Sequence, residues 1–154
     1  MTLDRYDRQI LELLQDNSQL SNQELAERIG LSPSPCLRRV RALEQSGLIT
    51  GYRALVDARK LGLTLLALVH IAMDRHTPDR FANFEKEVAR LPEVLECLLI
   101  TGQSADYQLK VVVADMADYD RTYKELIGRL PSLADVSALF SMERLKSTTG
   151  LPIP

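Results

Sequence analysis

Apolar residues in the first third of the chain recur every three or four positions, which is the spacing of amphipathic helices. Over residues 3–16 the apolar positions are Leu3, Tyr6, Ile10, Leu13 and Leu14. A second stripe consists of Leu25, Ala26 and Ile29, and a third consists of Leu37, Val40 and Leu43. This part of the chain is therefore predicted to form three helices.

The boundaries between these helices are marked by residues with specific backbone preferences. Ser21 or Asn22 can cap the second helix, and Gly30 can end it because a residue without Cβ accepts the left-handed conformation. Pro33 suits the first position of the third helix, after Ser32 as its N-cap, and Gly47 marks its end. Two helices joined by a tight turn with a glycine form a helix-turn-helix unit, whose second helix enters the DNA major groove.

The outward residues of this second helix are suited to DNA. Arginine presents a fork of donors that fits guanine and phosphate oxygens. We expect DNA contacts from Ser32, Ser34, Pro35, Arg38, Arg39, Arg41 and Arg53.

Some of these residues have a second interpretation. Arg39 can pair with an acid such as Asp4 or Asp7, and Ser32 acts first as a cap. Cys36, beside the basic residues, is either a packed small residue or a redox-sensitive thiol near a helix N-terminus. Helix-turn-helix patterns also occur in modules that bind protein or RNA, so the alternative function is a small-molecule-binding oligomer with such a partner.

The segment after the third helix predicts a short strand or hairpin over residues 48–56, the wing of a winged helix, followed by a turn and linker. This places a helix-turn-helix domain in residues 1–52, a wing and linker in 53–62 and a second domain in 63–154.

The second domain has a different periodicity. An apolar run over residues 63–73 predicts a buried strand, and Pro78 begins a helix that continues to about Arg90. Strands are predicted over 94–101 and 106–114, a helix over 117–130 and a last strand over 136–145. The order β-α-β-β-α-β predicts a ferredoxin-like antiparallel sheet with both helices on one face, so the fold class is α+β.

Such a sheet leaves one face without a covering layer. Strand side chains alternate, and the candidates for the open face are Leu66, Leu68, Leu99, Val112 and Leu139. An open apolar face indicates a partner, most simply a second copy of the chain, so a homodimer is expected.

Composition and charge limit the possible functions. The apolar content is 45% and the net charge is −2, so the chain has a core and does not coat nucleic acid in general. Within residues 32–60, however, six basic residues face two acidic ones, as in a local DNA-reading surface. The two cysteines form no CxxC pair, and no apolar run reaches the roughly eighteen residues of a membrane span. We therefore expect a cytoplasmic protein without a membrane partner.

Signatures of enzymes are missing from the sequence. It contains no glycine-rich phosphate loop, no HExxH and no GxSxG. We expect no catalytic residue, no metal ligand and no cofactor.

Motifs along nearly the whole chain resemble the Lrp/AsnC family of transcription regulators. They are LDRYDRQIL, ELAERIGLSPSPCLRRVRALEQSGLITGY, the linker DARKLGL, the turn LPEV, TG followed by DY, and MERLKSTTGLP. The resemblance implies a regulator that binds double-stranded DNA and senses a small amino acid. It also implies dimers that associate into tetramers or octamers.

The resemblance further implies that the effector binds between dimers, at the loop between the second and third strands. In this chain the loop comprises Thr101, Gly102, Gln103, Ser104, Ala105, Asp106 and Tyr107. Backbone N–H groups at a glycine turn suit a carboxylate, and Asp106 can pair with an ammonium group or simply cap the turn. The loop has one residue more between Gly102 and Asp106 than the family pattern, which changes the expected contacts.

Overall fold

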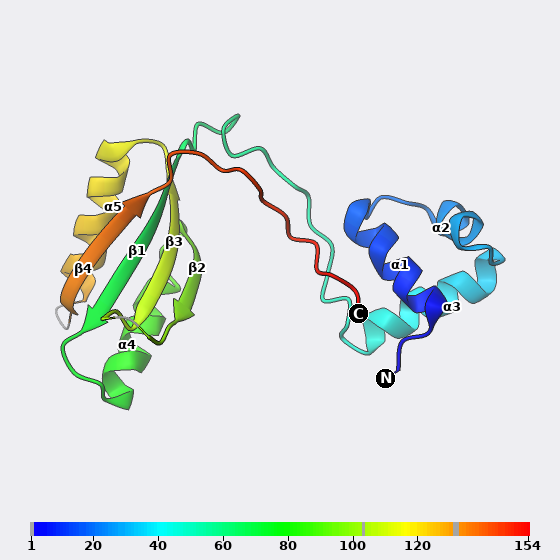
Figure 1. The fold of residues 1–154 in the computed structure, drawn as a ribbon, viewed down its shortest axis with the longest axis horizontal. Coiled ribbons are helices and arrows are strands. Elements are labelled where there is room, and N and C mark those ends of the chain that lie inside the picture. The colour runs from blue at the N-terminus through cyan, green and yellow to red at the C-terminus, as the bar shows by residue number, and fades with distance from the viewer. Residues whose placement is uncertain (1, 103, 131–132) are drawn as a thin grey trace. The chain divides into compact units, whose positions relative to one another are not determined.

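The computed structural model describes residues 2–102, 104–130 and 133–154 (Figure 1). The chain forms two compact units. The helical unit contains the residues up to Leu55 together with Lys146–Pro154, and the sheet unit contains Val56–Leu145. Within the described residues, none of the helices has the length and apolar character that crossing a membrane would require.

The helical unit contains α1 (Arg5–Asp16), α2 (Asn22–Ile29) and α3 (Pro33–Gln45). Both α1 and α2 begin with a capping box, formed by Asp4 with Asp7 and by Ser21 with Glu24. Gly30 ends α2 with a left-handed φ of 72°. The predicted helix-turn-helix is confirmed.

A small apolar core holds these three helices together. Ile10 of α1, Leu25 of α2 and Leu43 of α3 are each at most 2% exposed. Cys36 is also fully buried in this cluster. One face of α3 is thus fixed against α1 and α2, and the opposite face remains exposed.

The segment that follows α3 has no regular secondary structure. Residues 48–56 form neither a strand nor a hairpin, so that prediction is wrong. An isolated two-stranded hairpin is only marginally stable without an apolar face to bury. Here Leu55 and Val56 are 85% and 66% exposed, so neither side chain has a core to cover.

The sheet unit contains β1 (Leu65–Met73), α4 (Pro78–Val88), β2 (Val94–Leu99), β3 (Tyr107–Val113), α5 (Met116–Arg129) and β4 (Leu133–Phe140). The strands form one sheet in the order β2-β3-β1-β4, and every neighbouring pair is antiparallel (Figure 1). This is the predicted ferredoxin-like βαββαβ arrangement, and the α+β fold class is confirmed.

Side-chain alternation along β1 separates the two faces of the sheet. Ala67, Val69 and Ile71 are at most 2% exposed, and they pack in one cluster with Phe84 of α4 and Leu126 of α5. The residues between them belong to the other face and are only half-buried. The core of the unit therefore lies between the sheet and its two helices.

The open face carries most of the predicted leucines and valines. Residues directly opposite each other in a sheet share a face, and Leu68 lies opposite Leu139. Leu99, however, lies opposite the buried Tyr107, on the helix-covered side, so its assignment to the open face is wrong. A bulge between Val94 and Glu96 shifts the alternation by one residue, so that Leu98 faces the open side.

The last nine residues of the described chain pack with the helical unit and not with the sheet unit, to which the sequence assigned them. Ile153 packs against the core of the helical unit. The Gln15 side chain accepts a hydrogen bond from Leu151 N at 2.6 Å and donates one to Leu151 O at 3.0 Å. Arg8 Nε donates to Pro154 O at 2.7 Å. The hydrogen bonds join residues more than 130 positions apart, which explains why local patterns do not predict them.

Candidate functional site

The exposed face of α3 gathers residues that can contact DNA. Ser34, Arg38 and Arg41 are exposed, and their spacing of four and three residues places them on one side of the helix. Among the described residues, neither of these two arginines has an ion-pair partner. Both guanidinium groups are therefore available to an external anion.

The other residues predicted to contact DNA surround this face. Ser32 is the N-cap of α3, but its side chain makes no capping hydrogen bond. Its exposed hydroxyl is thus left for another partner. Pro35 is half-buried in the first turn, and Arg53 is exposed in the irregular segment after α3.

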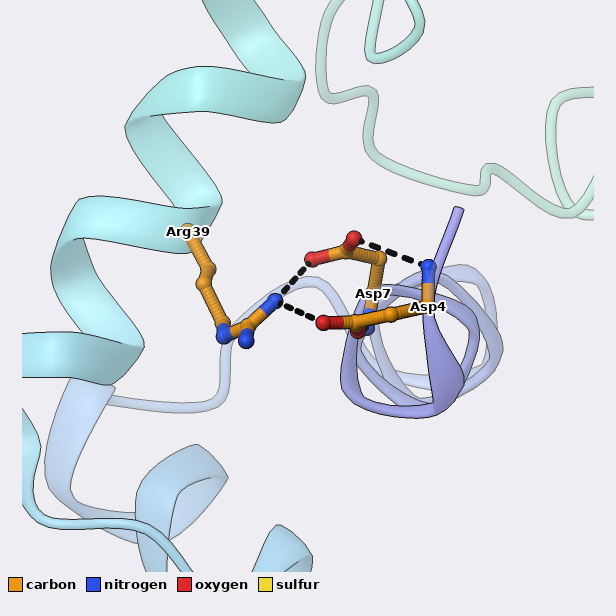
Figure 2. A network of polar contacts seen from close by, with 3 residues as sticks. All are labelled: Asp4, Asp7 and Arg39. Atoms are coloured by element: carbon orange, nitrogen blue, oxygen red, sulfur yellow. Dashed lines mark hydrogen bonds and ion pairs between the residues drawn. The ribbon is translucent and has the colours of Figure 1, made fainter. Parts of the chain in front are cut away.

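Arg39, in contrast, is held by two acids of the same unit. Figure 2 shows its side chain reaching from α3 to both carboxylates at the start of α1. Arg39 Nη1 lies 2.7 Å from Asp4 Oδ2 and 2.8 Å from Asp7 Oδ1, and its guanidinium carbon lies 5.2 Å from the centroid of the Tyr6 ring. The structure therefore shows the second interpretation of Arg39, an internal ion pair that joins α3 to α1.

The electrostatics of this cluster are favourable for the charged forms. A hydrogen bond from the Asp7 backbone N–H, followed in importance by the Arg39 side chain, lowers the pKa of Asp4. The Asp7 carboxylate in turn raises the pKa of Arg39. Both shifts favour the charged forms of Asp4 and Arg39, and so the ion pair between α1 and α3.

The loop between β2 and β3 is closed by a backbone hydrogen bond from Ile100 N to Asp106 O at 2.8 Å. Thr101, Gly102 and Ser104 are exposed, and Gly102 has a φ of 88° that favours glycine. Gln103 lies outside the described residues. Thr101, Gly102 and Ser104 are therefore accessible to a ligand.

Asp106 uses both carboxylate oxygens inside the unit. Its Oδ2 accepts a hydrogen bond from Met73 N at 2.7 Å, and its Oδ1 lies 2.7 Å from His76 Nε2. The Asp106 side chain is only 19% exposed. Asp106 therefore fixes the end of β1 and the turn that follows it. This role differs from both predicted ones, which were to bind the ammonium group of an effector or to cap its own loop.

Tyr107 also faces inward. The residue is 1% exposed, and its ring stacks on Phe84 with 4.3 Å between centroids. Its hydroxyl donates to Glu85 Oε1 at 2.8 Å. Burial, together with this carboxylate, raises the pKa of Tyr107. Of the loop residues predicted to bind the effector, Tyr107 is thus part of the core.

Both halves of the chain match known protein families. Residues 3–50 match the model of the winged helix-turn-helix DNA-binding domain, and residues 66–151 match that of the Lrp/AsnC ligand-binding domain. The chain belongs to the Lrp/AsnC family. It is a DNA-binding transcription regulator that carries the ligand-binding domain of this family.

Relatives in the Lrp/AsnC family align over nearly the whole chain. The DNA-binding transcriptional activator DecR of Escherichia coli K12 is 43% identical, with 98% of this chain and 99% of DecR covered. The leucine-responsive regulatory protein of the same strain is 44% identical, with 98% and 92% covered. These relatives are transcription regulators.

Solved structures of Lrp/AsnC regulators share the fold. An AsnC family regulator from Agrobacterium tumefaciens has a TM-score of 0.94 at 40% identity, covering 97% of both chains. A regulator from Neisseria meningitidis, solved as a complex with L-methionine, has a TM-score of 0.93 at 37% identity, covering 98% of this chain and 97% of that one.

The sequence spacing predicted that Leu37 of α3 belongs to the buried stripe, but the structure shows it exposed. Leu37 is 37% exposed and does not belong to the core cluster. Positions three apart drift by about 60° around a helix at each step, so Leu37, Val40 and Leu43 cannot all share the buried stripe. Cys36 is spaced four residues before Val40, and this spacing is the signal that identifies the true stripe.

The position of Cys36 on this buried stripe explains the properties of its thiol. Its side chain is 0% exposed, and burial raises the pKa of its thiol. A buried thiol with a raised pKa is poorly reactive. The structure therefore favours the packed residue over the redox sensor.

Proposed function

We propose that this chain reads double-stranded DNA with the exposed face of α3, using Ser34, Arg38 and Arg41, and that a small amino acid modulates its binding. The observation that carries the DNA contact is the pair of exposed guanidinium groups for which the described part of the chain offers no ion-pair partner. Arginine in the major groove donates to guanine O6 and N7, and on the flanks it neutralises phosphates.

The residues around this face have supporting roles in the proposal. Ser32, whose side chain makes no capping hydrogen bond, and the exposed Arg53 contact phosphates in this proposal. Pro35 shapes the first turn of α3. Arg39 keeps α3 in position through its acids and does not itself contact DNA.

Binding of the full-length chain to a labelled duplex from upstream of its own gene, titrated with salt, tests this proposal. We expect Arg38→Ala to weaken binding and, if Arg38 meets a phosphate, to reduce the slope of log affinity against log salt by about 1. Arg75→Ala is the matched control, because it removes another exposed arginine charge, one that belongs to the sheet unit. Equal losses in both variants, or no loss in either, would contradict the proposed contact. Binding of protein or RNA in place of any duplex would support the alternative partner class.

The proposed effector site is the tip of the loop between β2 and β3. Thr101, Gly102 and Ser104 are exposed there, and a carboxylate can accept hydrogen bonds from backbone N–H groups at such a turn. Asp106 acts by holding the base of the loop. The relatives named leucine-responsive and the relative solved with L-methionine support a small apolar amino acid.

Gly102→Trp tests this location by filling the turn. We expect it to abolish the effect of L-leucine or L-methionine on DNA binding and to leave binding without the amino acid unchanged. Gly102→Ala is the control, because it introduces the same backbone strain at a φ of 88° without the bulk. A Gly102→Trp variant that responds as wild type does would show that the amino acid binds elsewhere.

The proposed assembly is a homodimer formed through the open sheet face, which associates further into a tetramer or octamer. Leu68 and Leu139 lie opposite each other there, and Leu139 is 59% exposed. Burying this face against a second copy removes apolar surface from water and places two α3 helices on one duplex. Sedimentation of the full-length chain at micromolar concentration should show no monomer.

A further inference from the structure

Leu37 is an apolar side chain on the polar side of α3. It lies three residues after Ser34 and four residues before Arg41, so it neighbours both on the helix surface. It is 37% exposed, whereas Cys36 and Leu43 on the opposite side are fully buried. Val40, one turn further along, is half-buried and packs against the core, whereas Leu37 is exposed. More than a third of Leu37 is therefore left for a partner outside the helical unit.

The position of Leu37 brings it to the same partner as the two arginines. The inference rests on the proposed function, because it requires α3 to lie in the major groove. The edges of the base pairs in that groove carry donors and acceptors and a single kind of apolar group, the C5-methyl of thymine. The Leu37 side chain can make a favourable apolar contact with this methyl group, but it cannot form hydrogen bonds with the donors and acceptors of the base edges.

We infer that Leu37 contacts the C5-methyl group of a thymine and is a specificity-determining residue for DNA recognition. The contact removes the exposed part of the leucine and one methyl group from water together. The two arginines cannot supply this discrimination, because their donors fit oxygen and nitrogen acceptors. In this inference Leu37 recognises an apolar group of the DNA, and Arg38 and Arg41 recognise polar or charged groups.

Replacing thymine by deoxyuridine provides a direct test, since it removes the methyl group and preserves both hydrogen-bonding edges. The duplex is first selected from a random-sequence pool by the wild-type, full-length chain, and each thymine is then replaced in turn. We expect the affinity to fall about fourfold at one position of each half-site, which corresponds to about 0.8 kcal/mol for a methyl-sized group. Substitution at other positions should change affinity much less.

Leu37→Ala should bind the thymine and deoxyuridine duplexes equally well at that position. Leu48→Ala is the matched control, because Leu48 is another leucine of the helical unit, 50% exposed, and lies beyond the end of α3. It should keep the full fourfold difference. Circular dichroism should show that both variants are folded.

The outcomes separate this inference from the proposed function. Specific binding that no deoxyuridine affects overturns the role of Leu37 alone, as does a thymine preference that persists in Leu37→Ala. If the wild-type chain selects no duplex at all, the DNA-reading proposal fails and the role of Leu37 fails with it.

Discussion

Replacement of Arg39 by alanine should reduce the stability of the helical unit much more than its contact with DNA. The Asp7 side chain is 9% exposed and that of Arg39 is 30% exposed, so the pair is largely removed from water. Hydrogen bonds to charged groups contribute about 1.5–3 kcal/mol, and a buried carboxylate that loses its partner is strongly penalised. We therefore expect a loss of about 2 kcal/mol in the free energy of unfolding.

This loss is measurable by urea denaturation of the full-length chain. For a unit of roughly 60 residues, about 2 kcal/mol corresponds to a decrease in melting temperature of about 10 °C. A double-mutant cycle assigns the effect to its partner: Arg39→Ala should couple strongly to Asp7→Asn and more weakly to Asp4→Asn. The Asp4 side chain is 50% exposed, so solvent screens its interaction with Arg39.

The effect of Arg39→Ala on DNA binding is measured separately from its effect on stability. At a temperature at which the variant is fully folded, Arg39→Ala should keep the salt dependence of wild type, because Arg39 is not expected to neutralise a phosphate. Arg38→Ala should show the reverse, with normal stability and weaker binding. An Arg39→Ala chain as stable as wild type but with a reduced salt slope would refute the assignment of Arg39 to an internal role.

Two further predictions concern the helical unit. Ile153→Asp should lower the free energy of unfolding by about 1–2 kcal/mol, because it removes an apolar contact with the core. Gln15→Ala should lower it by about 1 kcal/mol, because it removes the hydrogen bonds to Leu151. Urea denaturation compares both variants with the control Glu12→Ala, which should be neutral. Folding lowers the pKa of Asp4 below 3.8, so its contribution is complete above that pH and is lost as pH falls through the lower, folded value. Asp4→Asn should therefore show a shallower loss of stability than wild type below about pH 4 in acid titrations.

Features fixed by neighbouring residues were predictable from sequence. The turn between α2 and α3 follows from Gly30 and Pro33, because one permits a left-handed backbone and the other begins a helix. The order of strands and helices in the sheet unit follows from periodicity and Pro78 in the same way. These rules act over a few residues and need no knowledge of the rest of the chain.

Several features that depend on distant parts of the chain were not predictable. The bulge after Val94 reverses the facing of Leu99, and it becomes visible only when β2 is paired with β3. The packing of Ile153 on the helical unit joins the two ends of the chain, and no local pattern contains it. The partners of Asp106, Met73 N and His76, lie about thirty residues away along the chain.

Exposure decides which charged residues of the two candidate sites are free to bind a ligand. Arg39 and Asp106 have the right chemistry for DNA and for an amino acid, but each is partly buried and each is paired inside its own unit. A partly buried charge requires such partners, because removing a charged group from water without a partner costs free energy. Arg38 directly precedes Arg39 in sequence and lies about 100° away around the helix, which leaves it exposed and, within the described residues, without an ion-pair partner. In this regulator the half-buried charges therefore hold α3 and the loop in place, and the proposed contacts with DNA and with the effector fall to their exposed neighbours.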